Sequence, residues 1–186
     1  MLKYLIILLL FPQPLGLDWE KKHTTLPNID GYKYFYGDIY WDPVVYYGTE
    51  DLLGLETEIH IHFGSKKITR AFLILGPSGL NNRNCLIKYK EVVKVLSQKY
   101  GNYRHTTERV DPLIEELIYS SRCYTTRLGM YQVRTHWSHK DRIIEASLLG
   151  DSDGLYIEIS YIDLNRSKQN EIKEKNKIFK KLSKEL

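Results

Sequence analysis

Apolar and polar residues alternate in two separate regions of the chain. Residues 56–63 alternate strictly, with Ile59, Ile61 and Phe63 on one side, and after the turn residues 64–66 the chain returns as a second strand over 67–75. Alternation with a period of two predicts strands with one buried face, and the short joint predicts an antiparallel hairpin. Residues 130–161 contain two more alternating runs, with a run between them over 142–149 that is half apolar on both faces. The joints at 138–141 and 150–154 are short and polar, which predicts a three-stranded antiparallel meander.

A helical period replaces this alternation between residues 85 and 100. Leu86, Tyr89, Leu96 and Tyr100 recur at helical spacing, and Gly101 stands where a left-handed C-terminal cap is expected. We expect this helix to lie across the apolar face of the sheet. A second helix is predicted from about residue 112 to 121, because Asp-Pro at 111–112 suits a helix start. Residues 122–127 fit either a last helical turn or a short strand.

These elements predict an α+β fold, with an antiparallel sheet of about five strands and the helices packed on one face. The single domain should cover residues 32–164, after an irregular lead-in over 17–31 that is polar and interrupted by proline. Residues 165–186 form a basic tail with eight Lys or Arg against three Glu, and their thin apolar stripe predicts a marginal helix.

The tail carries the positive charge of the whole chain. The formal net charge is +4, so the residues before 165 sum to about −1 and carry no basic patch of note. Such a tail is usually a solvated extension, and the functional alternative is contact with anionic surfaces such as lipid, glycans or nucleic acid. No specific nucleic-acid partner is predicted.

The first residues have the pattern of a secretory signal peptide. Lys3 precedes an eight-residue apolar run that stops at Pro12, whereas a membrane span needs about 20 apolar residues. We therefore predict a signal peptide over residues 1–16, export to the periplasm or the medium, and no transmembrane span in the mature form. A short buried strand and an uncleaved anchor are the alternatives.

The two cysteines are Cys85 and Cys123. In an exported protein this pair makes a disulfide plausible, and two buried free thiols are the alternative. Neither cysteine belongs to a Cys-x-x-Cys motif, so a thioredoxin-like redox centre is not expected.

Three histidines are the candidate metal ligands. His60 and His62 point to the same side of their strand, and His136 lies on the polar side of its own. Zinc held by these three residues could activate a water, with Glu145 or Glu158 as general base. The alternative is that these side chains form the solvent-exposed face of an antiparallel sheet, so that no cofactor is needed. A nucleophile elbow, a phosphate-binding loop and a His-Glu-x-x-His helix are all missing.

Residues 32–47 include eight aromatic side chains. Tyr32, Tyr34 and Tyr36 should project from one face of a strand, and a contact surface of Tyr34, Tyr36, Tyr40 and Trp41 could stack sugars or bases. More often such a segment is an edge strand and loop packed on the sheet.

The order of elements over about residues 56–161 resembles small exported bacterial proteins of uncharacterised activity. The shared features are a hairpin, a helix ending in Tyr-Gly, a strand with a tryptophan and a last strand of the form Ile-x-Ile-x-Tyr; here they are Tyr100, Gly101, Trp137, Ile157, Ile159 and Tyr161. The resemblance implies an α+β domain of the envelope or the medium, and it implies no activity.

Three functions are left open. The first is an exported, non-catalytic module that binds an envelope component or a protein partner. The alternative is a metal-dependent hydrolase built on His60 and His62. The third option is an inhibitor or immunity-type protein that uses residues 32–47 as its contact surface.

Overall fold

The structure is a computed structural model that describes residues 14–39, 43–48, 52–76, 80–111, 122–139 and 142–165. Most of the expected signal peptide, the helix expected over 112–121, the side chains of Tyr40 and Trp41, and the tail beyond residue 165 lie outside these ranges.

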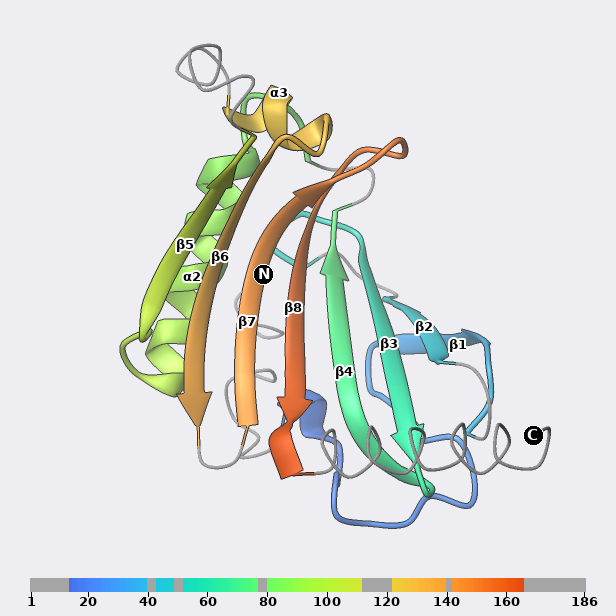
Figure 1. The fold of residues 1–186 in the computed structure, drawn as a ribbon. Coiled ribbons are helices and arrows are strands. Elements are labelled where there is room, and N and C mark those ends of the chain that lie inside the picture. Colours follow the sequence, from blue (N-terminus) through green and yellow to red (C-terminus); the bar gives the residue numbers. More distant parts are fainter. Residues whose placement is uncertain are drawn as a thin grey trace, which may run out of the picture.

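Eight strands of the described chain form one antiparallel sheet (Figure 1), in the order β1-β2-β3-β4-β8-β7-β6-β5. Two α-helices and one 3-10 turn accompany the sheet in these ranges. The elements are η1 (Pro14–Gly16), β1 (Tyr32–Tyr36), β2 (Val44–Gly48), β3 (Thr57–Gly64), β4 (Lys67–Leu75), α2 (Cys85–Tyr100), β5 (His105–Val110), α3 (Arg122–Arg127), β6 (Tyr131–His139), β7 (Arg142–Gly150) and β8 (Leu155–Asp163).

The hairpin and the meander expected from the alternation are both present, and they join through one long-range pairing. β3 pairs with β4, and β6, β7 and β8 pair in sequence. β4 then pairs with β8, which places Ala71 opposite Tyr161 and Leu73 opposite Ile159. This pairing makes one continuous sheet, and the buried residues of β2, β3, β4, β6, β7 and β8 belong to a single core.

The expected fold of about five strands with helices packed on one face is wrong. The sheet has eight strands, because β1 and β2 extend it beyond β3 and β5 extends it beyond β6. The sequence of β5 lacks alternation because the strand is exposed along nearly its whole length. The helical part is correspondingly small, since α2 has 16 residues and α3 has six.

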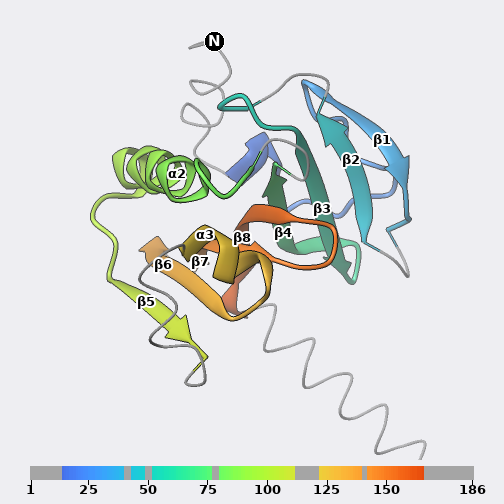
Figure 2. The ribbon, with the colours of Figure 1, turned by 90° about the horizontal axis from the view of Figure 1, so that it is seen from above.

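α2 lies on one side of the sheet (Figure 2) and contacts β6, β7 and β8. Its buried side chains are Cys85, Tyr89, Val92 and Leu96. They belong to one buried cluster with alternate strand residues, among them Ile59, Leu73, Val133, Trp137, Ala146 and Ile157. The irregular lead-in contributes the fully buried Trp19, and the Arg142 guanidinium lies 4.9 Å from the centroid of its ring.

The disulfide between Cys85 and Cys123 is confirmed. It ties the first residue of α2 to α3, with 6.0 Å between the two Cα atoms. A disulfide is compatible with an exported protein, since such bonds persist in oxidising compartments. None of the helices in the described ranges is long and apolar enough to cross a membrane.

Candidate binding surface on the open face of the sheet

The sheet has a second face, which we call the open face because neither described helix lies over it (Figures 1 and 2). Strand register aligns its side chains in rows that run across the sheet. One row contains His60, Phe72, Ser160, Glu145, His136 and His105, in order from β3 to β5. Apolar residues stand among the polar ones in the next rows, including Ile74, Ile143 and Ile162.

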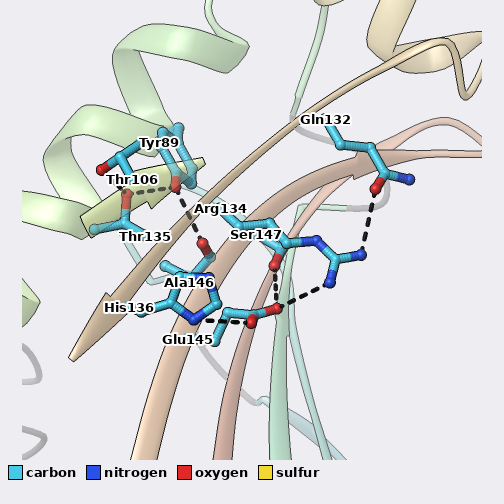
Figure 3. Close-up of polar contacts among 9 residues, drawn as sticks. All are labelled: Tyr89, Thr106, Gln132, Arg134, Thr135, His136, Glu145, Ala146 and Ser147. Atoms are coloured by element: carbon cyan, nitrogen blue, oxygen red, sulfur yellow. Dashed lines mark hydrogen bonds and ion pairs between the residues drawn. The ribbon is translucent and has the colours of Figure 1, made fainter. Parts of the chain in front are cut away.

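Glu145 is the centre of a polar cluster on this face (Figure 3). The Ser147 hydroxyl donates a hydrogen bond of 2.8 Å to its Oε1, and the Arg134 guanidinium lies 3.5 Å from the same oxygen. The other oxygen, Oε2, lies 3.2 Å from His136 Nδ1. Both oxygens of the carboxylate are therefore engaged by residues of the neighbouring strand β6, and Oε1 is also engaged by Ser147 of its own strand.

His136 also stacks on His105 of the edge strand β5, with 4.5 Å between the ring centroids. Burial lowers the pKa of His136 most strongly, and His105 and Arg134 lower it further against the opposing effect of Glu145. Burial therefore favours the neutral form of the imidazole. Among the described contacts Ser147 donates to Glu145 and not to the imidazole, so this cluster lacks the nucleophile–base contact of a hydrolase triad.

The three histidines expected to hold zinc do not converge. His60 and His62 share the open face, where His60 Nε2 lies 3.0 Å from Glu58 Oε2 and His62 packs edge-on against Phe72. His136 is four strand positions from His60 in the sheet, which corresponds to about 19 Å. No group of three His, Cys, Asp or Glu in the described ranges could hold a metal ion. Zinc binding here stays a hypothesis.

A bulge in β1 separates the tyrosines that were expected to share a face. The register shifts between Tyr34 and Tyr36, so Tyr34 lies opposite Tyr46 and Tyr36 lies opposite Val45. Tyr46 faces the core and Val45 lies opposite His60 on the open face. Tyr34 and Tyr36 therefore point to opposite sides, because one extra residue reverses the side-chain parity of a strand.

The same bulge gathers three exposed rings at the β1–β2 end of the open face. Phe35 lies 5.2 Å from Tyr36 and 4.8 Å from Tyr47, measured between ring centroids. The exposed fractions are 57% for Phe35, 48% for Tyr36 and 41% for Tyr47. We call these three residues the aromatic cluster. Phe35 and Tyr47 were not singled out from the sequence, since the density of aromatic residues was visible but the bulge was not.

A groove of about 320 Å³ lies next to this cluster, at the end of the open face where β8 begins. We call it the acidic groove because four carboxylates line it; its residues are Glu58, Ile74, Asp151, Asp153, Gly154, Leu155, Tyr156 and Glu158. Burial raises the pKa of Glu158 most strongly, and the charge of Glu145 raises it further. Sequence reasoning assigned residues 151–154 only to a turn, and it could not place that turn beside Glu58.

Comparisons of the chain with protein-family models, with curated proteins and with solved structures find no match. The resemblance to small exported bacterial proteins therefore stays a prediction.

Proposed function

We propose that this chain is an exported, non-catalytic module that binds an envelope component or a protein partner through its open face. The observation that carries this proposal is the aromatic cluster. Three aromatic side chains, each at least 41% exposed, gather on a sheet face that the described helices leave uncovered.

The arrangement of these rings suits recognition. Phe35 is in edge-to-face contact with both Tyr36 and Tyr47, so the rings hold one another in place before any partner arrives. Rigid aromatic side chains supply contact area at a small entropic cost, and they are enriched among the residues that dominate binding energies. Covering a half-exposed ring of this size contributes about 1 kcal/mol.

Export is supported by two independent features. The disulfide between Cys85 and Cys123 suits an oxidising compartment, and the apolar run near the N-terminus has the length of a signal-peptide core. The polar residues of the open face favour binding over catalysis, because the Glu145 carboxylate is already occupied by its neighbours and His60 is paired with Glu58.

Site-specific photocrosslinking tests the proposal. A benzophenone amino acid replaces Phe35 in one variant and Ile87 in the other. Both variants are expressed in the cells that naturally produce the protein, so that its own partner is present. Ile87 is a matched control because it is an exposed apolar residue, at 59%, on α2. We expect position 35 to give one discrete adduct, identifiable by mass spectrometry, and position 87 to give none. Equal labelling at the two positions, or none at either, contradicts a binding role for the aromatic cluster.

A further inference from the structure

We propose that the partner presents a cationic, extended peptide segment, whose Arg or Lys side chains enter the acidic groove while neighbouring apolar residues pack on the aromatic cluster. This inference rests on the proposed function and names the chemistry of the partner.

The groove and the aromatic cluster are parts of one surface. Glu58 lines the groove and also lies opposite Tyr47 in the pairing of β2 with β3. The two are electrostatically coupled, since the charge of Glu58 is the main cause that raises the pKa of Tyr47. A segment bound across Tyr47 would therefore continue directly into the groove.

The floor of the groove has the shape of a site for a long cationic side chain. Ile74 lies between Glu58 and Glu158 in one row across β3, β4 and β8, which separates the two acidic residues by about 10 Å. The methylene stem of an arginine or lysine can lie on Ile74 with its charged end beside a carboxylate. Tyr156 also lines the groove and offers a ring for a cation–π contact.

The charge of the groove selects a cation. Its lining has four carboxylates and no Lys or Arg. Asp151 is engaged in its own turn, because it accepts hydrogen bonds from the N–H groups of Asp153 and Gly154, and Glu58 is paired with His60. Asp153 accepts only a long hydrogen bond of 3.4 Å from the Ser152 hydroxyl, so Glu158 and Asp153 are the principal ligands of the proposed site. The raised pKa of Glu158 reflects a negative charge that burial and Glu145 disfavour, and a bound cation would relieve it.

An apolar and aromatic surface continuous with the groove favours a peptide segment over a free ion. Arginine suits such a site particularly well, because its planar guanidinium stacks on aromatic rings and pairs with carboxylates. Charge complementarity also predicts that association depends strongly on salt.

The test measures fluorescence anisotropy of a labelled octa-arginine peptide with the full chain at low salt. The groove variant carries Glu158→Gln and Asp153→Asn. The control variant carries Glu91→Gln and Glu20→Gln, which change the net charge equally at two acidic residues that pair with Lys88 and Lys67 outside the groove. Thermal unfolding followed by circular dichroism establishes that each variant is folded.

We expect the groove variant to bind octa-arginine at least tenfold more weakly than wild type, the control to change binding less than twofold, and Tyr47→Ala to weaken it as well. Octa-glutamate should not bind. The proposal is overturned if both double variants lose affinity equally, if a neutral Gly-Ser peptide binds as well, or if wild type does not bind octa-arginine. If octa-arginine binds only after residues 166–186 are deleted, the basic tail of the chain is the occupant of the groove, and this result would also overturn the proposal. If photocrosslinking gives a discrete adduct at position 35 but octa-arginine does not bind, the proposed function is retained and only the cationic nature of the partner is refuted.

Discussion

Replacing both cysteines with alanine should destabilise the protein strongly. Cys85 starts α2 and Cys123 lies in α3, and both are buried. Their bond spans a sequence separation of 38, and closing a loop of that length corresponds to about 4 kcal/mol in the chain-entropy model. A protein of this size loses about 2–4 °C in Tm for each kcal/mol, so Tm should fall by roughly 8–16 °C.

Calorimetry of three samples separates the bond from the packing of its sulfur atoms. The Tm of wild type should be the highest. The Tm values of wild type with a reductant and of the Cys85→Ala, Cys123→Ala variant should both be lower, and this order should not depend on protein concentration. The reduced sample keeps both sulfur atoms, so most of the loss should already be present in it. A fall of less than about 2 °C, or two thiols that react in the native protein without reductant, would refute the reasoning.

Three further predictions concern single residues. Tyr89→Phe removes a buried hydroxyl that lies 2.8 Å from Thr135 Oγ1 and donates a 3.0 Å bond to a β7 carbonyl, so urea unfolding should show a loss of about 1–2 kcal/mol. Glu158→Gln should raise Tm at pH 7 and leave it nearly unchanged at pH 4; because the folded pKa is raised, the stability from this carboxyl is present below about pH 4.5 and is lost as pH rises through the folded pKa. An equal gain at both pH values would contradict that reason. Gly150→Ala would place a Cβ against the Thr126 carbonyl oxygen, closer than van der Waals contact allows, so thermal unfolding should show a loss of about 1–3 kcal/mol, and a neutral effect would refute the close packing of α3 on β7.

The interior of the fold could be predicted from the sequence, whereas at the edges of the sheet only the strand at residues 32–36 was expected. β3, the first and last strands of the meander and α2 each bury mainly one face, so their residues follow the period of the element. β7 is buried on both faces at Ala146, Ser147 and Leu148 and was predicted from its apolar content and its short flanking joints. β5 buries neither face, and no hydrophobic period marks it. The extra pairing of β1 with β2 depends on a bulge, and a bulge leaves no signal in a short run of tyrosines.

For the candidate site, the sequence predicted only which side chains share one face of a strand, because side chains alternate between the two faces. Parity places His60 and His62 on one face, and the structure agrees. Whether His136 approaches them depends on strand order, and the β4–β8 pairing that separates them is a contact between distant parts of the chain. The same pairing brings the turn at 151–154 beside Glu58 and so creates the acidic groove.

Hydroxyl-radical footprinting tests the role of the open face most directly. Labelling of Phe35, Tyr36 and Tyr47 is compared between the purified protein and the protein in the intact cells that produce it, with Ile87 and Tyr103 as exposed controls. We predict strong labelling of all five side chains in the purified protein and selective protection of the aromatic cluster in the cells. Labelling of the cluster that stays equal to the controls in both samples would contradict the account.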